Sequence, residues 1–308
     1  MKSYLDIVQK ILFEGQLKKN RTGISALTIT NVFWEHNMSD GFPLLTTRKM
    51  PIKSTAVELE GFLNGITSKK WFQDRSCRYW DFWANPVKVQ EEIDRMQNNG
   101  YWKHNSVESE FGKSIQKEED DLGPLGYSWQ WRKFGQHYNE NDSWKEDYSV
   151  NEGFDQLKFI VEILKTNPDD RRLLCSGWNP NQQHMMALPP CHVMWNLAHV
   201  NGTLNLHYHQ RSCDFLCNQT ISTYALLLLL LCKESGLKPG KLSALFMDCH
   251  IYENHIEGAK LQLTREPLPL PKVYISSEGD FDIFKWTHKD FVIKDYHHYD
   301  PIKYVVAV

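Results

Sequence analysis

One of the seven cysteines stands where the backbone would hold it rigidly. Cys191 directly follows Pro189 and Pro190 and begins an apparent strand. A thiolate held at a fixed angle is a suitable nucleophile, although a cysteine in an apolar setting is also a common small core residue. Arg211 favours the first interpretation, because it falls on the paired strand of a predicted hairpin, and a guanidinium near a thiol favours the thiolate form.

Arginines at three further positions could act together with Arg211. Arg21 lies in a polar turn, and Arg171 and Arg172 follow two aspartates. Singly, each is typical of a surface charge. With Arg211 and Ser212 they would form a clamp for a phosphate monoester, because guanidinium groups offer forked donors to phosphate oxygens.

His192 is the immediate neighbour of Cys191. Successive residues on a strand point to opposite faces of the sheet. The two side chains should therefore diverge, which argues against a Cys-His hydrolase dyad built from this pair.

Glu58 is a carboxylate in a mostly apolar stretch with helical character, Val57–Phe62. Such a group either faces solvent or serves as a desolvated proton shuttle. The sequence leaves both interpretations open.

A metal-binding protein is the alternative from another functional class. His207, His209, Cys213 and Cys217 form an H-x-H-x3-C-x3-C run whose side chains are zinc ligands. The spacing is not that of a standard zinc finger. We therefore expect no metal site.

Composition sets wider limits. The chain has 308 residues, 41% of them hydrophobic and 13% aromatic, which predicts a globular protein with a substantial core. A formal charge of −3 disfavours a generally basic partner for nucleic acid or membrane surfaces. The odd number of cysteines and the lack of a signal-like N-terminus indicate reduced thiols in the cytoplasm.

The elements that would position these residues follow from periodicity. Helical spacing from Tyr4 to Leu12, with Ser3 as its cap and Gly15 as its stop, predicts an opening helix. The strongest signal is a β-hairpin, residues 193–200 and 203–210 around Asn201-Gly202. Other segments predict strands at 27–38 and 241–246, helices at 55–63, 154–164, 222–232 and 251–263, and a short β tail.

These elements predict a single α/β (α+β) domain spanning residues 1–308, with an antiparallel or mixed sheet flanked by helices. The stretch 87–121 is charged and poorly periodic, so we interpret it as an insertion whose loss should spare the fold.

An ordered series of motifs resembles the thymidylate synthase family along nearly the whole chain. The motifs are Asn20–Gly23, Asp40–Thr47, Trp80–Ala84, Asp121–Pro124, Gln130–Arg132, Asp170–Arg172, Pro189–His192, Gln210–Asp214, Asp248–Tyr252, Asn254–His255 and Val305–Val308.

The resemblance implies the family's fold, a homodimer through the sheet, and one-carbon transfer to a pyrimidine nucleoside monophosphate. Cys191 would add to C6 of the pyrimidine, and C5 would then accept carbon from 5,10-methylenetetrahydrofolate, with no metal. Glu58, with ordered water and Tyr127, would move protons, and Arg211 and His192 belong to the same catalytic group.

The resemblance also implies two sets of binding residues. The nucleotide set is Arg21, Gln210, Arg211, Ser212, Asp214, Asn218, Thr220, His250 and Tyr252, with Arg171 and Arg172 from the partner subunit. The folate set is Trp80, Asp81, Asp214, Leu216 and Val308.

The chain departs from the family pattern just after Asp214. Family members normally continue Leu-Gly-x-Pro-Phe-Asn-Ile, whereas residues 215–221 read Phe-Leu-Cys-Asn-Gln-Thr-Ile, about two residues shorter. Thr220 falls at the base-reading asparagine, or a shifted alignment places Asn218 there. One hydroxyl cannot read uracil as an amide does, although Thr220 would also suit a helix N-cap. Phe246-Met247 and His209 also differ from the residues that are usual at these positions in the family.

These departures favour a specialised pyrimidine deoxynucleotide hydroxymethylase or methylase, acting on dCMP or dUMP, over an ordinary thymidylate synthase. The family-like C-terminal tail, which would exclude water from the folate, argues for the synthase. A catalytically inactive member that binds nucleotides or RNA is the non-enzymatic alternative. The acidic balance and the intact Cys191, Glu58 and arginine set argue against it.

Overall fold

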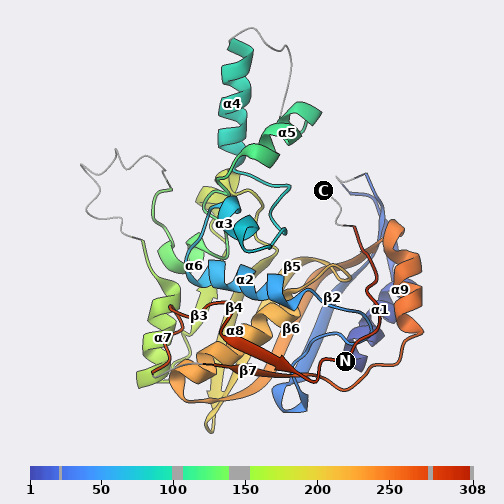
Figure 1. Ribbon diagram of the computed structural model, residues 1–308, viewed down its shortest axis with the longest axis vertical. Coiled ribbons are helices and arrows are strands. Elements are labelled where there is room, and N and C mark those ends of the chain that lie inside the picture. The colour runs from blue at the N-terminus through green and yellow to red at the C-terminus, as the bar shows by residue number, and fades with distance from the viewer. Residues whose placement is uncertain (21–22, 99–106, 139–152, 277–279, 306–308) are drawn as a thin grey trace. The chain divides into compact units, whose positions relative to one another are not determined.

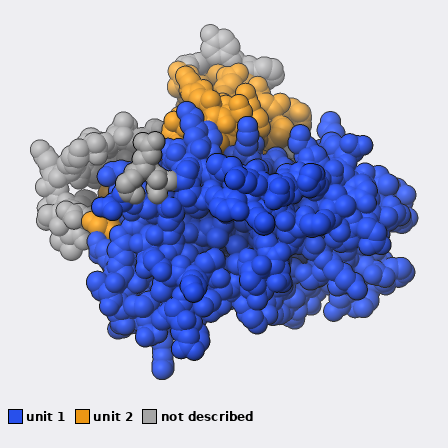
Figure 2. Space-filling view, turned by 60° about the horizontal axis from the view of Figure 1, so that its bottom comes forward, with its two compact units in different colours: residues 1–56, 161–174, 191–308 blue, residues 57–160, 175–190 orange. Residues whose placement is uncertain are grey.

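The structure, a computed structural model, describes residues 1–20, 23–98, 107–138, 153–276 and 280–305. The chain forms two compact units (Figure 2). Unit 1 comprises residues 1–56, 161–174 and 191–308, and unit 2 comprises residues 57–160 and 175–190. The mixed α/β architecture expected from the sequence is confirmed, and the single-domain interpretation stays a prediction.

A six-stranded sheet has the order β1-β2-β6-β5-β4-β3 (Figure 1), and all of it except the last two residues of β3 belongs to unit 1. Only β5 and β6 are parallel neighbours among the pairings with a described register, so the sheet is mixed. The strands are β1 (Gln16–Lys18), β2 (Ala26–Asn37), β3 (Leu174–Ser176), β4 (His192–Val200), β5 (Thr203–Asp214) and β6 (Lys238–Tyr252).

The predicted hairpin is formed by β4 and β5. Asn201 and Gly202 both have positive φ, 49° and 78°, as a tight two-residue hairpin turn requires. The pairing sets His192 opposite Gln210. Strand β5 continues to Asp214, four residues beyond the prediction, because β6 pairs with it along this length.

Helices cover one face of the sheet. α8 (Thr220–Ser235) connects β5 to β6 and packs on both, and its Leu-rich sequence is buried along most of its length. α1 (Lys2–Glu14) packs on β2. The predicted Ser3 cap of α1 is wrong: Met1 is the N-cap, and the Ser3 hydroxyl instead accepts a hydrogen bond from Trp34 Nε1 at 3.1 Å.

The C-terminal part of unit 1 begins with η4 (Glu253–His255) and α9 (Ile256–Leu263). The helix predicted to start at Ile251 therefore starts at Ile256, five residues later than predicted. Ile251 instead pairs with Leu27 and belongs to β6. β7 (Lys272–Ile275) and β8 (Phe291–Lys294) form a separate antiparallel pair, which confirms the short β tail. Within the described ranges no helix is long and apolar enough to cross a membrane.

Unit 2 is mainly helical and is built around aromatic side chains. Phe62 packs on Tyr127 and Trp131, with ring centroids 5.1 and 5.8 Å apart, and Trp80 lies 6.4 Å from Tyr127. The helices are α3 (Lys69–Asp74), α4 (Pro86–Asn98), α5 (Glu110–Glu118), α6 (Trp129–Lys133) and η3 (Pro180–Met185), together with most of α2 (Ile52–Leu63) and the start of α7 (Gln156–Thr166).

The predicted insertion contains ordered helices. Val89 and Ile93 of α4 pack with Ile115 of α5 in a small apolar cluster of their own. The stretch looked aperiodic because only a narrow stripe of each helix is apolar. Asp121 at its end is 4% exposed and accepts hydrogen bonds from Asn85 and Gly123. Asp121 is thus part of the packed structure, and the insertion itself stays a prediction.

Candidate active site

The hairpin brings Cys191 and Arg211 together. Cys191 lies immediately before β4, and its carbonyl accepts a hydrogen bond from the Arg211 amide at 2.8 Å. Cys191 is partly exposed. The pairing that the sequence predicted thus sets a guanidinium-bearing residue beside an accessible thiol.

His192 points into the core. It is 7% exposed, and its Nδ1 is 2.7 Å from the hydroxyl of Tyr224 on α8. Burial lowers the pKa of His192 to about 3, so the imidazole is neutral near pH 7. This setting suits a residue that positions the start of β4 better than one that transfers protons.

The turn after β5 is held by side chains. The hydroxyl of Thr220 is 2.9 Å from Gln210 Oε1 and 2.5 Å from Asn218 Oδ1, and Tyr208 OH is 3.2 Å away. Asn218 Oδ1 also accepts from the Thr220 amide at 2.9 Å. Thr220 is the first residue of α8 and not its N-cap, which is Gln219, so the N-cap interpretation is wrong.

Strand β6 carries the two residues expected at the sugar, His250 and Tyr252. His250 Nδ1 is 2.8 Å from Asp248, which also binds Lys18 Nζ at 2.5 Å. Partial burial raises the pKa of Asp248, but the bonds from Lys18 and His250 outweigh this and keep it below its usual value. The Tyr252 ring packs edge-on against His250, with centroids 5.1 Å apart.

The remaining predicted phosphate ligands are exposed or undescribed. Arg171 and Arg172 lie in the exposed turn after α7, where Arg172 pairs with Asp170 at 2.8 and 3.0 Å. Ser212 lies opposite Asp248 in the β5–β6 register. Arg21 and Val308 lie outside the described residues.

Glu58 belongs to unit 2, with Trp80 and Tyr127. Burial raises the pKa of Glu58 to about 8, although the nearby Trp80 indole acts in the opposite direction. Trp80 Nε1 makes no hydrogen bond of ordinary geometry within the described chain, so its influence is the smaller one. The sequence left the setting of Glu58 undecided, and its raised pKa indicates a desolvated carboxyl, whereas its role as a proton shuttle stays a prediction. Asp81 accepts a bond from Gln73 at 2.9 Å.

Asp214 ends β5 near Cys217 and His255. Asp214 Oδ1 is 3.9 Å from His255 Nδ1 and 3.4 Å from the Cys217 amide. Arg48, which the sequence analysis missed, is 5% exposed and donates to the Leu216 carbonyl. It directly follows the matched stretch 40–47, the one sequence signal that could have identified it.

The H-x-H-x3-C-x3-C run does not converge on one site. His207 lies on the outer face of the sheet, where it bonds to Ser243 at 2.9 Å and stacks on Phe33. Cys213 is fully buried and lies opposite Cys249 in the β5–β6 register. Within the described ranges, the one cluster with metal-ligand geometry is Asp214, Cys217 and His255.

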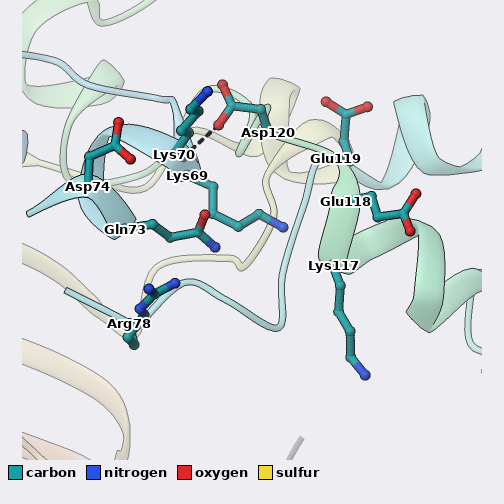
Figure 3. Close-up of a pocket in the computed structure, with 9 residues that line it drawn as sticks. All are labelled: Lys69, Lys70, Gln73, Asp74, Arg78, Lys117, Glu118, Glu119 and Asp120. Carbon is teal, nitrogen blue, oxygen red and sulfur yellow. Dashed lines mark hydrogen bonds between the residues drawn. The ribbon is translucent and has the colours of Figure 1, made fainter. Parts of the chain in front are cut away.

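Unit 2 also contains a polar pocket of about 270 Å³ (Figure 3). Four cationic and four acidic side chains line it, so it has no clear preference for an anion or a cation. The lining residues are Lys69, Lys70, Gln73, Asp74, Arg78, Lys117, Glu118, Glu119 and Asp120.

Comparison with known proteins decides the family. The family model described as thymidylate synthase matches residues 2–308. The chain belongs to the thymidylate synthase family. It is 36% identical over 320 residues to a thymidylate synthase of Mycoplasma pneumoniae, covering 100% of both chains. It is 38% identical over 307 residues to a bifunctional dihydrofolate reductase-thymidylate synthase of Paramecium tetraurelia, covering 99% of this chain and 61% of that relative.

Two departures from the thymidylate synthase pattern can now be located. Phe246 fills the core beside Tyr208 and Phe215, with ring centroids 6.0 and 5.6 Å away. Cys217, in the shortened stretch after Leu216, carries a thiol into the region of Asp214. Both changes lie in unit 1, on or beside the strands that carry the matched residues.

Proposed function

We propose that this chain transfers one carbon from a reduced folate to C5 of a pyrimidine nucleoside 5′-monophosphate through a covalent adduct at Cys191. The observation that carries the proposal is the pairing of Cys191 with Arg211 at the hairpin edge. The Arg211 guanidinium and the 5′-phosphate have opposite charge, so one residue can both hold the nucleotide and favour the thiolate.

The Cys191 thiolate would add to C6 of the base and make C5 nucleophilic. Bound methylenetetrahydrofolate would supply the carbon. Addition to C6 places negative charge on the base, which a proton donor must stabilise. Glu58 suits this task, because with a pKa raised to about 8 it is protonated near pH 7 and can return to the carboxylate within the catalytic range.

The polar atoms of unit 1 fit two substrates. His250, ordered by Asp248, offers an imidazole nitrogen to a sugar hydroxyl. Asp214 Oδ2 is buried and has no hydrogen-bond partner in the described part of the chain, so it can accept a bond from a ring N–H of the folate. Arg211 and Ser212 would hold the phosphate.

For the product, we favour methylation of dUMP. The two relatives carry the name thymidylate synthase, and Val305 of the C-terminal tail is anchored by its bond to His255. An anchored tail favours exclusion of water and transfer of hydride from the folate. This reverses the order of preference that the sequence alone suggested.

Hydroxymethylation, on dCMP or dUMP, is the second candidate, and the Thr220 network favours it. Thr220 bonds to Gln210 and Asn218, so no single amide is set to read a uracil edge as the family's asparagine does. A base with a different donor pattern could then be accepted.

Product analysis distinguishes these outcomes. The purified chain is incubated with methylenetetrahydrofolate and, separately, dUMP, dCMP, UMP and CMP, and products are identified by mass spectrometry. A methyl group on dUMP together with dihydrofolate supports the synthase. A hydroxymethyl group with tetrahydrofolate supports the second candidate. If no nucleotide reacts, and no adduct forms at Cys191 with a 5-fluoropyrimidine monophosphate and folate, the proposal is wrong.

We further propose that the chain is a homodimer through the sheet. α1 and α8 cover one face, whereas the opposite face exposes Phe33 (60% exposed), Met247 (42%) and Val200 (57%). A second copy on this face would bury these side chains and could supply Arg171 and Arg172, which are exposed in the single chain.

Complementation tests this arrangement. Cys191→Ser and Arg172→Ala chains, each nearly inactive, should regain activity when they are mixed and allowed to exchange subunits. Light scattering should report a dimer that Phe33→Glu weakens. A monomeric, fully active wild type would contradict the proposal.

A further inference from the structure

Three polar side chains form a chain of hydrogen bonds across the sheet of unit 1. Lys18 Nζ is 2.5 Å from Asp248 Oδ2, and Asp248 Oδ1 is 2.8 Å from His250 Nδ1. Asp248 and His250 are alternate residues of β6 and therefore share a face of the sheet. Lys18 is the last residue of β1, and β2 lies between β1 and β6 in the strand order. The lysine thus connects His250 to a strand at the edge of the sheet.

The hydrogen bonds of this chain have a defined direction. An ammonium group can only donate, and an ionised carboxylate can only accept. Partial burial alone would raise the pKa of Asp248, but the bonds from Lys18 and His250 hold that pKa below its usual value, so the carboxylate is ionised near pH 7. The proton between Asp248 and the imidazole therefore belongs to His250 Nδ1. In a neutral ring, Nε2 then carries the lone pair and accepts hydrogen bonds.

The exposure of the three side chains indicates where Lys18 has its effect. The His250 side chain is 10% exposed, that of Asp248 28% and that of Lys18 58%. An ion pair as exposed as that of Lys18 and Asp248 adds little to the stability of a fold. Lys18 does, however, bind Asp248 Oδ2, and this fixes the carboxylate with Oδ1 directed at the imidazole. The effect of Lys18 should therefore be on the state of His250.

We propose that Lys18 is a positioning residue for the nucleotide sugar: through Asp248 it sets the tautomer and orientation of His250, whose Nε2 accepts a hydrogen bond from the sugar. The inference rests on the proposed function and adds to it a residue that acts without contacting the substrate. A 2′-deoxynucleoside 5′-monophosphate has one free sugar hydroxyl, which is on C3′. The 3′-hydroxyl is therefore the group whose binding depends on Lys18.

Direct binding of the phosphate by Lys18 is the alternative. Asp248 lies opposite Ser212, which we assign to the phosphate, so an ammonium group at Asp248 is also near the proposed phosphate site. The two roles have different consequences. A lysine that binds phosphate affects every nucleoside 5′-monophosphate, whereas a lysine that positions His250 affects only nucleotides with a 3′-hydroxyl. The direct bond from Asp248 to His250 favours positioning.

Calorimetry with two nucleotides separates these roles. dUMP and its 2′,3′-dideoxy counterpart, which lacks the 3′-hydroxyl, are titrated into wild type and Lys18→Met. If product analysis identifies dCMP as the substrate, the matching cytidine pair is used. Lys18→Met should weaken binding of the deoxynucleotide by about 5- to 10-fold, a usual coupling within one hydrogen-bond network. The dideoxynucleotide should bind both proteins equally, to within about twofold.

Two lysine variants serve as controls. Lys18→Arg keeps a positive charge that can reach Asp248, and it should bind the deoxynucleotide as the wild type does. Lys241→Met removes another exposed lysine of the same sheet, one that pairs with Glu35 at 2.8 Å and has a side chain 56% exposed. It should alter the binding of neither nucleotide. An equal loss of binding in Lys241→Met and Lys18→Met would be a general effect of charge and would overturn the inference.

The tautomer of His250 can be measured without any ligand. ¹⁵N NMR of the imidazole, assigned by comparison with His250→Gln, should place the proton on Nδ1 in the wild type and show a mixture of tautomers in Lys18→Met. A proton mainly on Nε2 in the wild type would overturn the inference.

The binding data can overturn it in two further ways. If Lys18→Met weakens the deoxynucleotide and the dideoxynucleotide equally, Lys18 binds the phosphate. If it weakens neither, Lys18 has no role in binding. In both cases the wild type still binds its nucleotide and the proposed function stands. If the wild type binds none of these nucleotides, the proposed function is wrong and this inference with it.

Discussion

Two parts of unit 1 that lie only a few residues apart are held in different ways. The edge formed by Cys191 and Arg211 is fixed by main-chain hydrogen bonds of the β4–β5 hairpin. The turn from Asp214 to Thr220 is fixed by side chains, chiefly Thr220, Gln210 and Asn218. A main-chain framework keeps its geometry when side chains change, whereas a side-chain network changes with each substitution. We infer that the covalent step and the choice of base can vary independently.

The largest effect should come from Cys191→Ser. Loss of the nucleophile should reduce kcat/KM by about 10⁴-fold or more and abolish the covalent adduct with a 5-fluoropyrimidine monophosphate. Stability should change by less than about 0.5 kcal/mol, because the Cys191 carbonyl keeps its bond to the Arg211 amide. Nucleotide binding by calorimetry is the control. A variant that fails to bind nucleotide would show that the edge depends on its side chain after all.

Glu58→Gln should have the next largest effect, a loss of about 10²- to 10⁴-fold in kcat. The same variant should alter the pH dependence of stability. The pKa of Glu58 is raised to about 8 in the folded chain, so the carboxyl stays protonated to a higher pH in the folded state than in the unfolded state. Wild-type stability should therefore fall between about pH 4.5 and pH 8 relative to Glu58→Gln, by roughly 3–5 kcal/mol, since one pKa unit corresponds to about 1.4 kcal/mol. Urea unfolding at several pH values measures this, and parallel curves for the two proteins would contradict it.

Thr220→Val should have a moderate effect confined to the turn. It keeps the shape of the side chain but removes the hydroxyl that joins Tyr208, Gln210 and Asn218. We expect about a 10-fold change in the ratio of kcat/KM for dUMP and dCMP, since an unpaired buried amide costs about 1–3 kcal/mol. Thr220→Ser, which keeps the hydroxyl, is the matched control. Equal effects of Val and Ser would mean that the methyl group, and not the hydrogen bond, matters.

Removal of residues 87–119, bridged by a short linker, should have the smallest effect on catalysis. We expect kcat/KM within about 3-fold of wild type and a stability loss of about 2 kcal/mol. The buried Lys69, which is 2% exposed, donates a hydrogen bond from its ammonium group to the Gln116 carbonyl of α5. The stability loss arises because the deletion removes this acceptor. Lys69→Met in the shortened chain should recover most of the stability, as measured by thermal unfolding. A large loss of activity would show that the insertion serves the active site.

Much of the fold was predictable because local signals and tertiary structure agree. The Asn201-Gly202 turn identifies its hairpin, and the Leu-rich run identifies α8. Prediction failed where distant partners decide. The local pattern around Ile251 is helical, but the residue is extended because it pairs with Leu27. Ser3 is a plausible helix cap, but its hydroxyl accepts a hydrogen bond from the Trp34 indole instead.

The candidate site was predictable in part for the same reason. Cys191 and Arg211 could be paired because the hairpin register follows from its turn. The state of Glu58 could not be predicted, because its pKa depends on burial by residues distant in sequence. The cluster of Asp214, Cys217 and His255 could not be predicted either. It forms because β6 runs parallel to β5, so that η4, which follows β6, lies near the end of β5.

The central position of β6 also bears on how the chain folds. β6 pairs with β2, some 220 residues earlier, and with β5 through the α8 crossover. Contacts between segments so far apart form slowly, because a long loop must close before they contribute any stability. Until β6 is in place, the apolar run of α8 lacks one of the two strands on which it packs. Refolding from denaturant should therefore be slow and sensitive to protein concentration, with aggregation competing against completion of the sheet.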